Sequence, residues 1–417
     1  MVRGHVALVD ASPACLSGGL VAAFKEAGYA CVHVQSTAVR PKLYQKVVPT
    51  GFVAEVVHRG DLDETLRELS RYDLRAVIPD SEYGVGFADL LSERLGLLTN
   101  GTAGSLARRD KYVMVEKIKA AGLRGARQLL VKNAEELERW HRELAGKIVV
   151  KPVSSAGSDG IHYCDTPEEA VRAYRSLAGT QDVFSLRNDT VLAQEYLAGP
   201  EYAINMVSRD GKHHVCDVWN ATHITANGVL DLCDGLVLQP YEGEKIEQAV
   251  RYAEQVLDAL DILHGPSHVQ IRMTPSGPCV IEVAARMGGG NTAHYARMGT
   301  GESQLNWTVY AYVDPETFLA RHQERYQVKH FVAGAPMISP VEGTLRAYRG
   351  LDRVKSLESY HGLREFVRGG EPIVPTVNDF TYALLVELRH EVQETVLRDL
   401  ATVRYLDGAD FYDVGPR

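Results

Sequence analysis

The segment Pro266–Asn291 constrains the fold of this chain more than any other stretch. Two short apolar runs, His268–Met273 and Cys279–Ala284, flank a Thr-Pro-Ser-Gly-Pro sequence that favours a turn. This order predicts a β-hairpin. If the strands pair about the centre of the turn, residues whose numbers sum to about 552 face each other. Gln270 then lies opposite Glu282.

Gln270 and Glu282 could form half of a site for a hard cation, because an amide oxygen beside a carboxylate suits Mg²⁺. Arg286 and the glycine run Gly288–Gly290 follow at once and place a positive charge and open backbone beside that site. The simpler interpretation is a surface hairpin with a salt-bridged glutamate and a flexible loop. The hairpin alone does not decide between the two.

Bulk properties exclude several classes of protein. The 417 residues are 45% hydrophobic and 24% charged, which predicts a globular protein of two to three domains. A net charge of −9 argues against a nucleic-acid partner. No apolar run approaches the roughly 20 residues that span a bilayer. Arg3, His5 and Asp10 interrupt the first apolar stretch and make a poor signal peptide. The six cysteines lack Cys-x-x-Cys spacing, so we expect reduced thiols in a cytoplasmic protein without a membrane partner.

The N-terminal region predicts a parallel α/β sheet, because strands and helices alternate along it. These segments are His5–Val9, Leu20–Ala27, Ala30–Gln35, Asp61–Ser70 and Ala76–Pro79. The Ser17-Gly-Gly stretch suggests a dinucleotide site, but Gly-x-Gly-x-x-Gly is missing, and we disfavour NAD binding. Glu82 follows a strand at the edge where such sheets bind ligands. A carboxylate that stabilises a helix N-terminus is the simpler interpretation of Glu82.

A loop of small residues follows an apolar strand in the middle of the chain. The strand is Lys147–Pro152, and the loop Val153–Gly160 lets backbone N–H groups approach phosphate oxygens while Lys151 adds a charge. The order strand, loop, strand excludes a P-loop, which leads into a helix. Many hairpins carry similar loops. Upstream, Asp110-Lys111 opens a helix that reaches about Ala121.

Further elements follow from periodicity and capping residues. Helices are predicted over Glu135–Leu144, Thr166–Leu177 (with Thr166 as N-cap and Pro167 first), Glu244–Leu260, Gln304–Val313 and Glu391–Thr402. Strands are predicted over Val191–Tyr196, Tyr202–Ser208, His214–Asn220, His330–Ala333, Gly343–Ala347 and Tyr382–Glu387.

Four of these segments, in this order, resemble the motifs of the ATP-grasp carboxylate–amine ligases. They are Asp110-Lys111, Val149-Val-Lys-Pro152, Gln194-Glu-Tyr-Leu-Ala-Gly-Pro-Glu201 and Ile281-Glu-Val-Ala-Ala-Arg286-Met-Gly-Gly. Each motif alone is common, but four in the family's order and spacing are not. The resemblance covers roughly Arg109 to Gly301. Within the family, Ala284-Ala285 and the long chain look most like the L-amino-acid ligases, which make dipeptides and peptide-like metabolites.

The resemblance implies a chain of mixed α/β and α+β class with the ATP-grasp fold. It predicts an N-terminal Rossmann-like (pre-ATP-grasp) α/β domain over 1–105, a lid subdomain over 106–200 and a large subdomain with the metal site over 201–324. A C-terminal α+β extension would occupy 325–417. This extension could pair two copies into a homodimer or wall the substrate pocket.

The resemblance also implies functional residues. ATP would be bound by Lys111, Lys151, Ser154, Ser155, Gly157, Ser158, Glu195, Tyr196, Leu197 and Glu201. In this set the lysines hold the phosphates, residues 154–160 close over them as a mobile lid, residues 195–197 contact adenine, and Glu201 takes the ribose hydroxyls. Mg²⁺ or Mn²⁺ would be held by Gln270 and Glu282. Arg286 would face the transferred phosphoryl group, and Asn291 the substrate carboxylate or leaving phosphate. His268 could contact the substrate or assist the amine, although a structural histidine is the simpler interpretation.

Two positions depart from the family pattern. The family usually carries a carboxylate where this chain has Gln270, which removes one negative charge and could reduce two metal ions to one. It often has asparagine where this chain has Ala284, and the amino-acid ligase type tolerates alanine there. A non-catalytic ATP-binding regulator is therefore an open alternative. The retained lysines, Glu282 and Arg286 argue against it.

The predicted function is an ATP-dependent ligase that joins a small-molecule acid to an amine, both amino-acid-like, through an acyl-phosphate. It releases ADP and phosphate. A biotin-carboxylase-like enzyme is the runner-up in the family, but the chain has no Met-Lys-Met carrier segment. We expect the residues that select the substrates to lie in loops over Trp219–Asp234 and Asn291–Gly301.

Overall fold

The computed structural model describes residues 2–11, 19–45 and 48–416. Its first sheet is parallel, with the strand order β3-β2-β1-β4. The strands are β1 (His5–Val9), β2 (Ala30–Gln35), β3 (Ala54–Val57) and β4 (Leu74–Pro79), and the helices are α1 (Gly19–Glu26), α2 (Leu62–Leu69) and α3 (Val85–Arg94). The predicted α/β region is confirmed. Ser17 lies outside the described residues, and Gly19 begins α1.

Alternation along β1 sends its side chains into two separate cores. Ala7 and Val9 pack under α2 and α3, whereas Val6 and Leu8 pack against α1 and α9 (Gln304–Val313). Both faces of the sheet are therefore covered, as a parallel sheet requires. Its carboxyl edge remains available to carry polar side chains.

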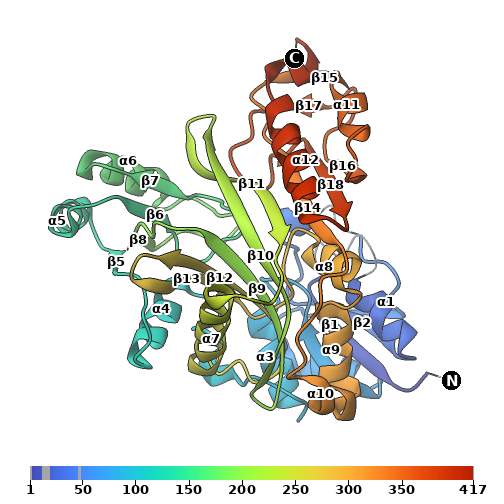
Figure 1. The fold of residues 1–417 in the computed structure, drawn as a ribbon. Helices are drawn as coiled ribbons and strands as arrows, with labels where there is room; N and C mark the ends of the chain where they lie inside the picture. Colours follow the sequence, from blue (N-terminus) through green and yellow to red (C-terminus); the bar gives the residue numbers. More distant parts are fainter. Residues whose placement is uncertain (1, 12–18, 46–47, 417) are drawn as a thin grey trace.

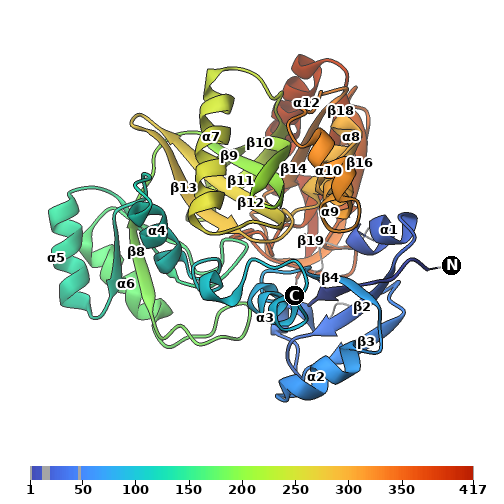
Figure 2. The same ribbon diagram turned by 90° about the horizontal axis from the view of Figure 1, so that it is seen from below.

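A second, antiparallel sheet has the order β5-β8-β6-β7. The strands are β5 (Gln128–Val131), β6 (Ile148–Pro152), β7 (His162–Cys164) and β8 (Val191–Glu195). They are accompanied by α4 (Lys111–Ala120), α5 (Ala134–Leu144) and α6 (Pro167–Leu177). Thr166 caps α6 through a capping box with Pro167 in the first turn, as predicted. Figures 1 and 2 show this sheet with α5 and α6 projecting from one side of the molecule.

The largest sheet is antiparallel, with the order β13-β12-β9-β10-β11-β14-β18-β16. Its strands are β9 (Glu201–Arg209), β10 (Lys212–Ala226), β11 (Val229–Leu238), β12 (Gly265–Thr274), β13 (Gly277–Ala284), β14 (Phe331–Met337), β16 (Tyr360–Glu365) and β18 (Leu384–His390). The pairing of β11 with β14 carries this sheet across residue 325, so the C-terminal strands continue it in Figure 1. The three boundaries between the four predicted domains remain predictions.

The other elements surround these sheets. The helices are α7 (Glu244–Ala259), α8 (Thr292–Thr300), α10 (Pro315–Arg321), α11 (Leu351–Lys355) and α12 (Gln393–Leu406). A small sheet joins β15 (Gly343–Tyr348), β17 (Pro372–Ile373) and β19 (Tyr412–Gly415). Short 3₁₀ turns are η2 (Lys42–Tyr44), η3 (Thr102–Gly104) and η4 (Ala409–Phe411).

The prediction of loops over Trp219–Asp234 and Asn291–Gly301 is wrong. The first segment is most of the β10–β11 hairpin, which reverses at Asn227-Gly228 with φ of 52° and 76°. Positive φ at both central residues is the geometry of a type I′ turn, for which Asn-Gly is the strongest short signal. The second segment contains α8, which ends at Gly301 in the left-handed region.

Two bulk expectations can be compared with the structure. None of the helices in the described part of the chain has the length and apolar character needed to cross a membrane. Five cysteines, at positions 31, 164, 216, 233 and 279, are free thiols, and Cys15 lies outside the described residues.

Candidate active site

The β12–β13 hairpin places the two predicted metal ligands directly opposite each other. Gln270 pairs with Glu282, in the register expected from the sequence. A bulge between Gln270 and Ile271 shifts the pairing nearer the turn, where Thr274 pairs with Gly277. The predicted register is therefore correct at Gln270 and Glu282, and it is shifted by one residue between the bulge and the turn.

Lys111 connects this hairpin to the loop of small residues. The Asp110 carboxylate caps α4 by accepting from the backbone N–H groups of Tyr112 and Val113, and Lys111 follows at once. Its Nζ lies 3.0 Å from Glu282 Oε1 and donates to the Ser155 carbonyl at 2.8 Å. Burial would raise the pKa of Glu282, but the charges of Lys111 and Lys151 hold that pKa below its ordinary value. Glu282 is therefore an ionised carboxylate ringed by cations.

Lys151 lies on β6 and is 4% exposed. Burial, followed by the charge of Lys111, lowers its pKa to about 8, although Glu282 opposes the shift. A buried positive charge that is poorly balanced by negative charges destabilises the folded state. Such a residue is typical of a site built to receive an anion.

We expect Lys151→Met to stabilise the nucleotide-free protein near neutral pH by on the order of 1 kcal/mol. Below pH 8 the folded and unfolded chains both carry the Lys151 proton, so the folded chain bears the full cost of the buried charge. That cost declines as the pH rises from 8 to 10.5, because the folded chain then releases the proton first. Denaturant unfolding near neutral and near alkaline pH measures the difference.

The matched control for this prediction is Lys132→Met, which removes an exposed lysine and should leave the free energy of unfolding unchanged. A Lys151→Met protein less stable than wild type at neutral pH would contradict the expected cost of the buried charge.

The small-residue loop, defined here as the phosphate loop (Ser154–Gly160), is internally braced. Ser155 Oγ donates to Asp159 Oδ2 at 2.9 Å. Gly157 and Ser158 both have positive φ, at 64° and 61°, which turns consecutive backbone N–H groups toward one side. The loop joins β6 to β7 and starts beside Lys111, whose N–H donates to the Val153 carbonyl at 3.0 Å.

The predicted adenine and ribose residues follow β8. The Glu195 carboxylate accepts from the Arg127 backbone N–H at 2.9 Å and pairs with the Arg127 guanidinium at 2.8 Å. Contact with a base would therefore use the backbone of this segment, and the Tyr196 N–H already donates to the Lys147 carbonyl. Gly199 is required beyond Leu197, because a Cβ there would lie 2.1 Å from the Met273 carbonyl oxygen.

Glu201 begins β9 and is buried. Burial raises its pKa to about 7, although Arg272 lies 3.0 Å away and opposes the shift. Arg272 also lies 3.3 Å from Asp231 on β11. The predicted ribose carboxylate thus sits in a cluster with more acids than bases.

Arg286 faces the carboxyl edge of the parallel sheet. Its Nε lies 3.2 Å from Glu82 Oε2, and Arg109 Nε lies 3.6 Å from Glu82 Oε1. Glu82 is 7% exposed, and Tyr44, whose pKa burial raises to about 12, is hydrogen-bonded to Ser81 next to it. Sequence analysis raised Glu82 as a weak candidate and missed Arg109 and Tyr44, which no spacing connects to it.

His268 belongs to a polar ladder across three strands. His268 is the register partner of Asn205 on β9, and Asn205 pairs with Asp217 on β10. Asn205 Nδ2 donates to Asp217 Oδ1 at 2.5 Å, as does Trp219 Nε1, and Asn205 Oδ1 lies 2.7 Å from His268 Nδ1. Because the amide oxygen faces it, Nδ1 donates and Nε2 is left as an acceptor. Burial lowers the pKa of His268 to about 3.

Asn291 adopts the left-handed conformation (φ 67°) at the N-cap of α8. It follows the glycine run that comes after Arg286, so it lies at the turn between the hairpin and this helix.

The oxygen donors fit a magnesium ion. Within residues 2–11, 19–45 and 48–416, no three His, Cys, Asp or Glu side chains gather into a metal site. Gln270 and Glu282 supply two oxygens across one strand pair. Mg²⁺ is typically held by one or two protein oxygens while waters and substrate phosphates complete its shell.

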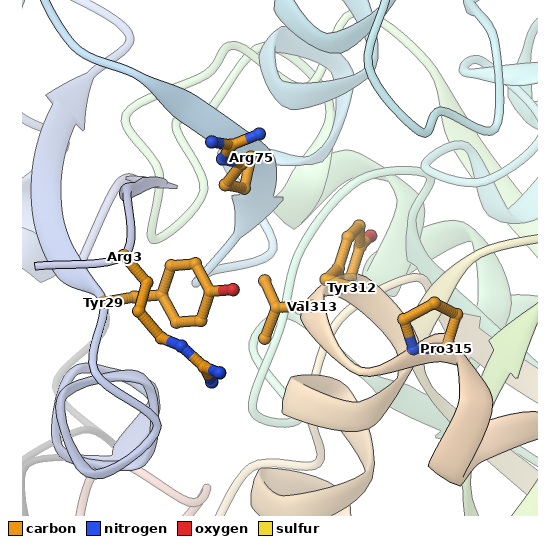
Figure 3. A pocket seen from close by; sticks show the side chains of 6 residues that line it. All are labelled: Arg3, Tyr29, Arg75, Tyr312, Val313 and Pro315. Atoms are coloured by element: carbon orange, nitrogen blue, oxygen red, sulfur yellow. The ribbon is translucent and has the colours of Figure 1, made fainter.

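A cavity of about 420 Å³ lies elsewhere on the molecule, lined by Arg3, Tyr29, Arg75, Tyr312, Val313 and Pro315 (Figure 3). Arg3 and Tyr29 precede β1 and β2, so this cavity is at the amino edge of the parallel sheet. Glu82 is at the opposite edge. None of the predicted site residues lines the cavity.

Comparisons with known proteins agree on one family. A family model described as an ATP-grasp domain matches residues 144–294. Dapdiamide A synthase of Enterobacter agglomerans is 32% identical over 350 residues, which is 79% of this chain and 80% of that protein. The L-arginine-specific L-amino acid ligase of Bacillus subtilis is 24% identical over 242 residues, 56% of this chain and 57% of that protein. The crystal structure of the L-amino acid ligase from Bacillus licheniformis matches all of both chains with a TM-score of 0.77 at 19% identity.

Proposed function

Because this chain belongs to the ATP-grasp carboxylate–amine ligases, we propose that it joins two amino-acid-like small molecules through an amide bond. The observation that carries the proposal is the Lys111–Glu282 ion pair, with Lys151 and Arg286 beside it. Lys111 can exchange its present partners for a phosphate, Lys151 can gain a phosphate as the counter-charge it lacks, and Glu282 can exchange Lys111 for a metal ion. The name of the similar L-arginine-specific L-amino acid ligase supports amino acids as substrates.

The nucleotide is proposed to bind with its phosphates between the two lysines and the phosphate loop. The backbone of Glu195–Leu197 would contact the adenine, and Glu201 the ribose. Gln270 and Glu282 would hold Mg²⁺, which, when bound, supplies charge neutralisation for the phosphates. Lys111 and Lys151 orient the γ-phosphate, and the phosphate loop excludes water from it.

The reaction proposed has two steps. A carboxylate oxygen of the first substrate attacks the γ-phosphorus, the bond to the bridging oxygen breaks, and ADP leaves. The amine nitrogen then attacks the acyl carbon, the C–O bond to phosphate breaks, and the amine proton leaves with the phosphate. Arg286 stabilises the charge that develops on the phosphoryl oxygens. Nε2 of His268 accepts a hydrogen bond from the amine, which orients the lone pair of the amine nitrogen toward the acyl carbon.

The substrate end is proposed to lie between Arg286 and the carboxyl edge of the parallel sheet. Glu82 and Arg109 present one acid and one base there, and Glu82 lies 3.2 Å from Arg286 Nε and 3.6 Å from Arg109 Nε. A zwitterionic amino acid carries the complementary pair of charges. Asn291 at the start of α8 is proposed to hold a carboxylate or phosphate oxygen.

The proposal is tested by mixing the protein with ATP, Mg²⁺ and pairs from a panel of amino acids. ADP, phosphate and amide, measured by enzyme-coupled assay and mass spectrometry, should appear together for at least one pair. Binding of ATP without amine-dependent turnover for any pair would refute the ligase function.

Gln270→Glu is expected to lower the Mg²⁺ concentration that gives half-maximal turnover, on the order of tenfold, because ligand charge sets the affinity of such sites. Gln270→Leu should raise that concentration, since it removes one oxygen donor. Both variants keep the hairpin register. An unchanged Mg²⁺ dependence in both would mean that Gln270 does not bind the metal.

A further inference from the structure

The C-terminal region reaches back to the phosphate loop through one short segment, defined here as the C-terminal loop (Thr376–Tyr382). It lies between β17 and β18. The Asp379 backbone N–H donates to the Gly157 carbonyl at 3.3 Å. Residues 157 and 379 are far apart in sequence, so this contact links the loop between β6 and β7 to the last part of the chain.

Phe380 covers Gly157. A Cβ built on Gly157 would lie 2.4 Å from Phe380 Cζ, a separation that real side chains do not reach. Phe380 is nevertheless 46% exposed, so its contact with Gly157 lies near the surface of the protein. Glycine at 157 thus satisfies two demands, a positive φ and room for an aromatic ring.

The C-terminal loop is firmly anchored at both ends. At its start, Asn227 Nδ2 donates to the Thr376 carbonyl at 2.9 Å, and the Ser339 N–H donates to Thr376 Oγ1 at 3.0 Å. At its end, the Tyr382 hydroxyl donates to the Cys233 carbonyl at 2.8 Å. These partners lie on or beside the β10–β11 hairpin, which stands next to the C-terminal part of the chain in Figure 1.

Internal hydrogen bonds brace the turn itself. Thr381 Oγ1 accepts from the backbone N–H groups of Val377 and Asn378 at 2.8 Å and 3.0 Å, and Asn378 Oδ1 accepts from Phe380 N–H at 3.1 Å. These hydrogen bonds hold the C-terminal loop, and with it the backbone of Phe380, in one position. The phosphate loop, built of small residues, is the partner that can move against it.

We propose that Phe380 and the Asp379 backbone are positioning elements that hold the phosphate loop closed over the transferred phosphoryl group. This rests on the proposed ligase function. The C-terminal region then completes the nucleotide site, and its contribution is to keep water from the acyl-phosphate until the amine arrives.

The first test measures hydrogen exchange of the phosphate loop in the full chain with ADP and Mg²⁺. Phe380→Ala should speed exchange over residues 154–160 by roughly fivefold, because it removes an aromatic contact. Phe366→Ala is the matched control: Phe366 is also in the C-terminal region, is 50% exposed and should leave the exchange unchanged. Equal protection in Phe380→Ala and wild type would overturn the proposal, whatever the turnover.

The second test measures the ratio of ADP to amide formed. Wild type and Phe366→Ala should give a ratio near one. Phe380→Ala should raise the ratio of ADP to amide by about threefold or more, since water competes with the amine for the acyl-phosphate when the phosphate loop opens. A purely structural role would lower both products equally, and that result would count against the proposal. Absence of amide in the wild type would instead refute the ligase function and leave the exchange result to decide the role of Phe380.

Discussion

Glu282→Gln is expected to lower turnover by roughly a thousandfold, equivalent to about 4 kcal/mol of barrier. The substitution keeps the size of the side chain but removes its charge and replaces one acceptor oxygen with an NH2 donor. The charges of Lys111 and Lys151 hold the pKa of the Glu282 carboxyl below its ordinary value. Lys111 Nζ lies 3.0 Å from Glu282 Oε1. Without it the proposed metal ion loses its only protein carboxylate, because its partner in the hairpin is Gln270.

Steady-state kinetics and nucleotide-binding measurements on Glu282→Gln together distinguish a ligase from a protein that only binds ATP. A ligase should retain nucleotide binding within about tenfold while losing turnover. Glu143→Gln, on the exposed face of α5, is the matched control and should behave as wild type. A protein that only binds ATP as a regulator would have no turnover to lose, and the variant would change its ATP affinity alone. Full activity in Glu282→Gln would exclude Glu282 from the metal site.

The parts of the site that could be predicted from sequence are those built from neighbouring residues. Strand alternation and a Pro-rich turn suffice to set Gln270 opposite Glu282, and the structure has that pairing. Thr166 and Pro167 define the start of α6 for the same reason, since a cap and a first-turn proline act within four residues. Local chemistry determines local geometry in both places.

Predictions failed where a local signal was overlooked or where polar residues interrupt a strand. The Asn227-Gly228 turn is a strong hairpin signal, yet a loop was expected over Trp219–Asp234. The last residues of β10, Thr222–Ala226, are exposed or half-buried, so this end of the strand lacks a continuous apolar run. Strand β3 was missed as well, because it is only four residues long.

Contacts between distant segments lay beyond sequence reasoning. Glu82, Arg109 and Arg286 come together only because the parallel sheet, α4 and the hairpin meet at one place. The His268–Asn205 contact requires the register of β12 against β9, which no turn specifies. The reach of Phe380 to Gly157 depends on the path of the whole C-terminal region. In each case the sequence shows the residue itself, but it does not show which distant residue that side chain contacts.

Arg286→Gln is expected to lower turnover by roughly a thousandfold or more, the scale on which arginines act in phosphoryl transfer. The guanidinium pairs with Glu82 at 3.2 Å and donates through Nη1 to the Met287 carbonyl at 2.5 Å. These two contacts hold the guanidinium at the carboxyl edge of the parallel sheet. Glutamine ends at the level of the arginine Nε and brings no charge to the developing phosphoryl oxygens. The effect should fall on the catalytic rate more than on ATP binding, which the two lysines support.

Two comparisons separate this role from a structural one. Arg297→Gln removes an exposed arginine from α8 and should leave turnover unchanged. Glu82→Gln keeps Arg286 and removes its partner, so it should raise the KM of the acid substrate while leaving part of the catalytic rate. If Arg286 served only to pair with Glu82, the two variants would have equal effects on rate and stability. A larger loss in Arg286→Gln, with unfolding unchanged, places the arginine at the reacting phosphoryl group and the glutamate beside the substrate.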